Sequence, residues 1–134
     1  MRSETQTVTI ECDATKVFDY VADPANLPVW ATGFARGVRR EQKGWIVDTP
    51  QGEVGIRVET DPDLGVVDFH ISPAPGAENV VRSRVVPNGT GADYVFTQLQ
   101  FEGMPDEVFE GQSKALSAEL ELLKSLLEGE SRAV

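Results

Sequence analysis

The sequence predicts an α+β fold: a curved, seven-stranded antiparallel sheet with its helices gathered on one face. Three observations predict it. Residues 7–12 alternate polar and apolar side chains, as a half-buried strand does. Residues 34–101 hold six short β-prone runs that are separated by turn residues. Residues 105–127 carry apolar side chains at helical spacing. We therefore expect two short helices after the first strand and a long C-terminal helix across the concave face.

The segment after the first strand contains two helix starts. Asp13 is placed as an N-cap, and apolar side chains at helical spacing follow it over 14–22. Asp23 and Pro24 begin a second, shorter helix, because aspartate caps and proline has a backbone angle already suited to the first turn. Pro28 bounds that helix within about one turn.

The middle of the chain is a series of hairpins. Its connecting segments are short and rich in glycine, proline, asparagine and aspartate, which favours tight turns over helical crossovers. With the first strand, the six runs form an antiparallel meander. The runs cover residues 34–41, 45–49, 53–60, 66–72, 79–86 and 93–101.

The closing helix is the most regular part of the pattern. Pro105 lies in its first turn, and Asp106 and Glu107 place negative charge at the positive end of the helix dipole. Gly129 is expected to follow the last turn as the C′ residue. At about 24 residues the helix is roughly 36 Å long, enough to cross the sheet. Its apolar stripe consists of Phe109, Leu116, Leu120, Leu123 and Leu127.

Composition narrows the classes of function. The chain has 134 residues and a net charge of -10, which argues against nucleic acids and anionic membrane surfaces as partners. Its single cysteine, Cys12, leaves no internal disulfide framework, and we expect neither a metal site nor a nucleotide cofactor. With no apolar run near the amino end, the expectation is a cytoplasmic protein without membrane insertion, a monomer or weak homodimer. We expect one domain over 1–134, with an ordered core of about 5–129.

The curvature of the sheet and the low aromatic content predict a cavity. A curved sheet cannot contact a straight helix everywhere, and aromatic residues make up only 7% of the chain, so the gap is not expected to be filled. Trp30 and Phe34 are placed at its mouth, although Trp30 also reads as a core residue. The side chains predicted to line it and bind a ligand are Trp30, Phe34, Ile56, Val58, Val67, Phe69, Val81, Leu116, Leu120 and Leu123.

At two places the chain resembles a known family. Val8 to Ile10 leads into the run from Val17 to Trp30, which reads V-F-x-x-V-x-D-P-x-N-x-P-x-W, and residues 107–124 look like a gripping helix. The sequence resembles the START-like, or SRPBCC, superfamily in its polyketide cyclase/dehydrase-like branch, over essentially its whole length. The resemblance implies the helix-grip fold. Members of the superfamily include lipid carriers, aromatic polyketide cyclases, coenzyme-Q-binding proteins, plant hormone receptors and chaperone activators, so it implies no single activity.

Three functions follow as hypotheses. The first is binding of a small hydrophobic molecule, such as a lipid, isoprenoid or aromatic polyketide, between the sheet and the closing helix. The second is a cyclase or dehydratase acting on a ligand in the same cavity, for which His70, Tyr94 and Asp48 are the candidate catalytic groups. The third is a protein-interaction module like the chaperone activators, which would have an exposed apolar patch and a collapsed cavity.

Strand parity bears on the enzyme hypothesis. His70 alternates with Phe69 and Ile71, which places it on the convex face, away from the cavity. The last strand can be read in two ways. The preferred reading buries Val95, Thr97, Leu99 and Phe101, and the alternative turns Tyr94, Phe96, Gln98 and Gln100 toward the pocket.

Overall fold

The protein is a seven-stranded antiparallel sheet wrapped around one long helix. The computed structural model describes residues 1–132, and side chains as far as Gly129. The strand order across the sheet is β1-β7-β6-β5-β4-β3-β2, so the chain forms a meander that β1 closes by pairing with β7. The strands are β1 (Ser3–Ile10), β2 (Gly37–Glu41), β3 (Gly44–Thr49), β4 (Gly52–Asp61), β5 (Val66–Ser72), β6 (Asn79–Asn88) and β7 (Gly91–Leu99).

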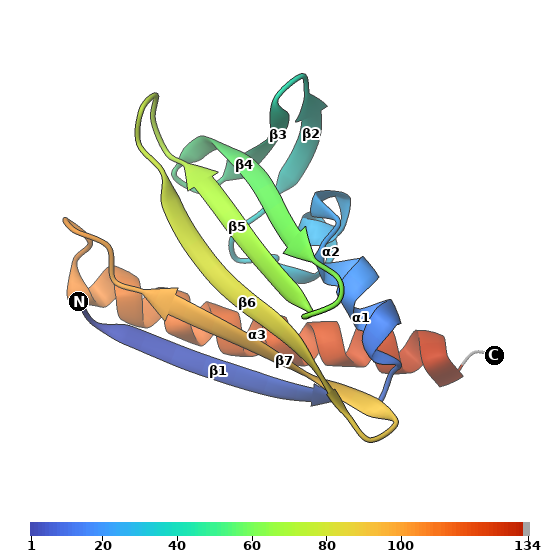
Figure 1. Ribbon diagram of the computed structural model, residues 1–134. Coiled ribbons are helices and arrows are strands. Elements are labelled where there is room, and N and C mark those ends of the chain that lie inside the picture. The colour runs from blue at the N-terminus through green and yellow to red at the C-terminus, as the bar shows by residue number, and fades with distance from the viewer. Residues whose placement is uncertain (133–134) are drawn as a thin grey trace.

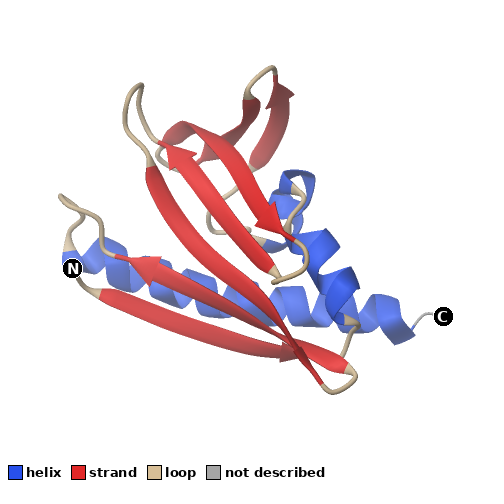
Figure 2. Ribbon diagram, viewed as in Figure 1, coloured by secondary structure: helices blue, strands red, loops and turns tan. Residues whose placement is uncertain are grey.

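The helices lie on the concave side of the sheet (Figures 1 and 2). They are α1 (Ala14–Val21), the 3₁₀ turn η1 (Pro24–Asn26), α2 (Leu27–Trp30) and α3 (Asp106–Arg132). The two predicted caps are confirmed, since Asp13 accepts from the Thr15 amide and Asp23 from the Ala25 amide. None of the helices within residues 1–132 has the combination of length and apolarity that crossing a bilayer requires.

The close-packed core lies beside the second half of α3. There α1 packs against β6 and β7, and Val17 and Val21 of α1 are fully buried. Leu123 and Leu127 of α3 are buried in the same core, each contributing about 1.5–3 kcal/mol by leaving water. α1 ends at Val21, and farther along the chain α2 packs against α3.

The largest differences from the predicted element boundaries are at three places. β1 begins at Ser3 instead of residue 7, because it pairs with β7 as far as Leu99. β2 begins at Gly37, because the segment from Phe34 is held in a turn. There the backbone N–H groups of Phe34 and Ala35 donate hydrogen bonds to the Ala31 carbonyl. The long helix begins just after Pro105 and continues through Gly129 to Arg132, so Gly129 is not its C′ residue. A glycine inside a helix lowers helix stability by only about 1 kcal/mol relative to alanine. Burial of Leu127 in the preceding turn offsets this cost.

The preferred parity of the last strand was wrong from Tyr94 to Gln98, although Leu99 and Phe101 of the preferred set line the same cavity as Gln98. Tyr94 is completely buried and Gln98 is 8% exposed, both on the face toward the helices, while Val95 and Thr97 are half-buried on the other face. Both faces of β7 carry apolar side chains, so periodicity alone could not decide between them. The buried polar atoms decide it: the Tyr94 hydroxyl donates to Ser83 Oγ and the Gln98 amide reaches α3.

Candidate functional site

A cavity of about 510 Å³ lies between the concave face of the sheet and the first half of α3. Its walls come from α2 and the loop after it, from β4 to β7, from the loop before α3, and from α3 itself. The α3 side chains that line it recur every four residues from Glu107 to Glu119, which corresponds to about 18 Å of helix. Val108, Gly111 and Gln112 are exposed and mark the mouth, while Leu116 and Glu119 are buried at the inner end.

Six of the ten predicted lining residues lie in the wall of this cavity: Trp30, Phe34, Ile56, Phe69, Val81 and Leu116. The other four do not. Val67, Leu120 and Leu123 are buried in the core and Val58 packs against it. α1 packs on β6 and β7, and its Val17 and Val21 belong to the same buried cluster as Val67, Leu120 and Leu123, so this part of the concave side is filled.

None of the three predicted catalytic candidates lines the cavity. Tyr94 is buried behind its wall, where its hydroxyl donates to Ser83 Oγ (O···O 3.0 Å) and that hydroxyl donates to the Val67 carbonyl (2.6 Å). Burial raises the pKa of Tyr94, so the phenol stays neutral. The Asp48 side chain is exposed on β3, next to buried Val47, and alternation therefore turns it away from the cavity.

His70 lies on the convex face, as its parity predicts. Its Nδ1 is 2.9 Å from Glu78 Oε1, and its Nε2 is 3.3 Å from Glu59 Oε2. The hydrogen bond with His70 lowers the pKa of Glu78 below its ordinary value, and the Arg57 guanidinium adds to the effect. His70 thus belongs to a surface charge cluster formed by β4, β5 and the loop before β6, and it does not line the cavity.

Glu119 is a cavity residue that the sequence pattern did not single out. It is 8% exposed and lines the cavity, and its Oε2 accepts a hydrogen bond from the Gly33 backbone N–H (2.9 Å). Burial raises its pKa, and the backbone donors of Gly33 and Phe34 oppose that rise. A signal was present, because Glu119 lies three residues after Leu116 and four before Leu123, inside the apolar stripe.

Gln98 and Trp30 also carry polar atoms in the cavity wall. The Gln98 amide donates to the Phe109 carbonyl and to Gln112 Oε1 (both 3.3 Å), and accepts from the Ser113 hydroxyl (3.2 Å). These bonds fix β7 against α3. Trp30 is 2% exposed and packs edge-on against Tyr94 at 6.1 Å between ring centroids, and its Nε1 has no hydrogen-bond partner among the described residues.

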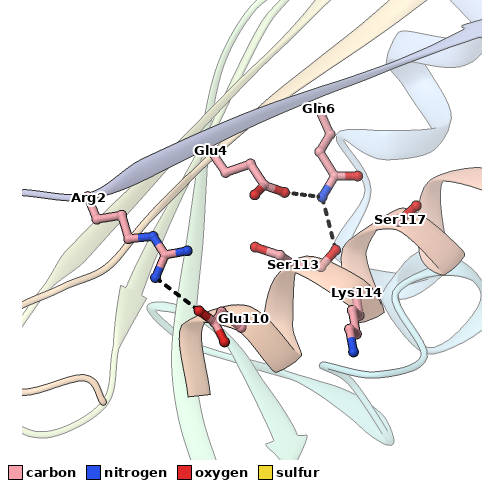
Figure 3. Close-up of a pocket in the computed structure, with 7 residues that line it drawn as sticks. All are labelled: Arg2, Glu4, Gln6, Glu110, Ser113, Lys114 and Ser117. Carbon is pink, nitrogen blue, oxygen red and sulfur yellow. Dashed lines mark hydrogen bonds and ion pairs between the residues drawn. The ribbon is translucent and has the colours of Figure 1, made fainter. Parts of the chain in front are cut away.

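A second hollow, of about 470 Å³, lies outside the cavity between β1 and the start of α3 (Figure 3). Several of its polar groups already bond to each other. Arg2 pairs with Glu110 at 3.4 Å, and the Gln6 amide donates to Glu4 at 3.0 Å and to the Ser113 carbonyl at 2.9 Å. This hollow is polar and exposed, so the internal cavity is the better candidate for a binding site.

Comparisons with known proteins agree on one architecture. A family model described as "Polyketide cyclase / dehydrase and lipid transport" matches residues 1–133. No curated protein matches the chain. An uncharacterised protein from Bacillus thuringiensis superposes with a TM-score of 0.74 at 14% identity, over 94% of this chain and 98% of that one.

Two other solved structures are similar. A START superfamily protein from Mycobacterium smegmatis has a TM-score of 0.69 at 14% identity, over 95% of this chain and 97% of that one. The di-domain ARO/CYC protein BexL of the BE-7585A biosynthetic pathway has a TM-score of 0.70 at 19% identity. It is matched over 92% of this chain and 45% of its own. At these identities the likeness concerns the fold.

Proposed function

This chain belongs to the polyketide cyclase / dehydrase and lipid transport family, and on that premise we propose that it binds a small hydrophobic molecule inside its cavity. The ligand is of the lipid, isoprenoid or aromatic polyketide type. The fold is the helix-grip arrangement of START-like proteins, whose helix and curved sheet enclose such a space.

The observation that carries the proposal is the cavity itself. Its volume of about 510 Å³ falls within the range of roughly 300–1,000 Å³ for small-molecule sites. Its walls are mainly aliphatic and aromatic, with a few fixed amide and carboxylate groups, which suits a ligand that is mostly apolar. A module that acts only through protein contacts would be expected to fill this space.

A second function in the same cavity is supported by Glu119. A cyclase or dehydratase needs a group that can take and return a proton beside the ligand. Glu119 lines the cavity and burial raises its pKa, the direction that acid–base catalysis at neutral pH requires. In this reading Glu119 takes the place of His70, Tyr94 and Asp48 as the candidate acid or base.

The test is to block the cavity without disturbing the fold. Gly111 lines the mouth, and a Cβ atom placed on it would meet no atom within 4 Å. A Gly111→Phe variant would therefore put a ring into the entrance. Gly129→Phe is the matched control, because Gly129 is also in α3, also has open space at its Cβ, and lies outside the cavity wall.

Native mass spectrometry of the proteins purified from their own cells provides the readout. We expect the wild type and Gly129→Phe to carry a small hydrophobic molecule and Gly111→Phe to lose it while unfolding at a similar temperature. Equal retention by both variants would place the ligand elsewhere. If the wild type carries no molecule and binds none of a panel of lipids, isoprenoids and aromatic polyketides, the proposal is wrong.

A further inference from the structure

The charge inside the cavity has one sign. Among the residues that line it, all within the described part of the chain, the ionisable side chains are Glu107 at the rim and Glu119 at the inner end. No lysine, arginine or histidine is among them. An anionic group on a ligand would therefore find negative charge and no cation to offset it.

Glu119 is held where a ligand would meet it. The Gly33 N–H bonds one of its oxygens at 2.9 Å, and the Phe34 backbone is a second donor to the same carboxylate. Both donors belong to the loop after α2, so the carboxylate is fixed between that loop and α3. Because its surroundings are largely apolar, a second negative charge beside it would be poorly screened, and the two charges would repel each other.

The other polar side chains of the wall are neutral. They are the amides of Gln51, Asn79, Gln98 and Gln112, which can donate or accept a hydrogen bond, and the indole of Trp30, whose N–H can only donate. The Gln98 amide already bonds to Phe109, Gln112 and Ser113, so its orientation is set. A carboxylate accepts hydrogen bonds and offers none when it is ionised, so Glu119 calls for a donor on the ligand.

We propose that the cavity selects amphipathic ligands whose polar group is a hydrogen-bond donor, a hydroxyl or an amine, and that Glu119 is the residue that rejects carboxylates and phosphates. This rests on the proposed function, because it names the chemical class of the ligand for the same cavity. It separates alcohols, phenols and amines from fatty acids and acidic phospholipids.

The experiment uses three probes with the same chain and different head groups: decanol, decylamine and decanoate. Their binding to the wild type is measured at neutral pH and physiological salt, where charge effects across the surface are screened. We expect decanol and decylamine to bind and decanoate to bind about tenfold more weakly, or worse. In Glu119→Gln the gap between decylamine and decanoate should fall to within about threefold, because the variant side chain is neutral and its amide donates as well as accepts.

Glu121→Gln is the matched control. Glu121 is exposed in the same helix and outside the cavity wall, so this variant changes the net charge equally. If Glu121→Gln narrows the gap as much as Glu119→Gln, the selectivity comes from overall charge and the proposal is wrong.

The ranking of the three probes by the wild type tests the proposal even if Glu119→Gln does not fold. Binding of all three probes with equal affinity, or preference for decanoate, would overturn the selectivity and leave the binding function intact. Failure of all three to bind, together with no co-purifying molecule, would instead overturn the binding function.

Discussion

The Glu119 carboxylate in the middle of α3 accepts a 2.9 Å hydrogen bond from the backbone N–H of Gly33, 86 residues earlier in the chain. This bond joins the loop after α2 to the long helix. The same loop carries Phe34, which lines the cavity opposite the sheet. The inner end of the cavity therefore depends on one buried carboxylate and the backbone of one glycine.

Gly33→Ala tests how tightly that loop fits. A Cβ atom on Gly33 would lie 3.1 Å from Ala115 Cβ and 3.4 Å from Glu119 Oε2, and the helix that carries both cannot easily give way. We expect a loss of about 1 kcal/mol or more in the free energy of unfolding, measured with urea. Gly37→Ala is the control, because a Cβ there meets nothing within 4 Å. Equal stability of the two variants would show that the loop has room to move.

The pH dependence of stability tests the environment of Glu119. Burial raises its pKa above 4.5, so over the range from about 4.5 up to the folded pKa the native state holds a proton that the unfolded chain has released. The native state binds more protons there, and this contribution to stability falls as pH rises. Glu119→Gln cannot ionise, so we expect it to gain stability relative to the wild type from acidic to neutral pH.

Urea unfolding of both proteins at several pH values gives the difference directly. Glu121→Gln, which removes an exposed carboxylate from the same helix, corrects for the lost charge. A difference between wild type and Glu119→Gln that stays constant with pH, or that changes in the opposite direction, would contradict the raised pKa.

The buried chain from Tyr94 through Ser83 to the Val67 carbonyl predicts non-additive substitutions. Tyr94→Phe removes one hydrogen bond and should cost about 1 kcal/mol. Ser83→Ala leaves the Tyr94 hydroxyl buried without its partner and should cost about 1–3 kcal/mol. The double variant should cost less than the sum of the two, because it leaves no orphaned hydroxyl. Strict additivity in urea unfolding would mean that the hydroxyls do not depend on each other.

His70→Ala separates the convex face from the cavity. Because the hydrogen bond from His70 is the largest cause of the lowered pKa of Glu78, the variant should raise that pKa toward 4.5. A lowered carboxyl pKa stabilises the native state above pH 4.5, and that stabilisation is lost as pH falls through the folded pKa. In the variant, the free energy of unfolding should therefore fall less over this pH range. NMR titration of the Glu78 side chain measures the shift. Retention of a cavity ligand should be unchanged, and a loss of ligand would contradict the placement of His70.

Much of the fold could be predicted from local patterns. The hairpin turns, the caps at Asp13 and Asp23 and the stripe of α3 are signals carried by neighbouring residues, so they survive without tertiary information. The convex position of His70 followed from simple alternation in β5. β7 could not be assigned in the same way, because apolar side chains occupy both of its faces and only the partners of Tyr94 and Gln98 distinguish them.

The site was predictable in part for the same reason. Six of the ten expected lining residues face the cavity, because strand alternation and helical spacing place side chains on the correct face. Strand alternation and helical spacing do not show how far a neighbouring helix or strand extends over the buried face. Val67, Leu120 and Leu123 are on the correct face but belong to the closed core cluster that also contains Val17 and Val21 of α1.

By itself, then, the sequence determined the order of elements and the faces they bury. It also determined that the closing helix is too long for a curved sheet to contact along its whole length. Only the tertiary structure decided where the gap lies and what chemistry it holds. The core cluster that includes α1 leaves the cavity beside the first half of α3, and the Gly33 backbone bonds to Glu119 in its wall. The physical reason is that periodicity reports which side of an element is buried, whereas a cavity depends on which distant elements fail to meet. A buried charge likewise depends on partners that lie far away in the sequence.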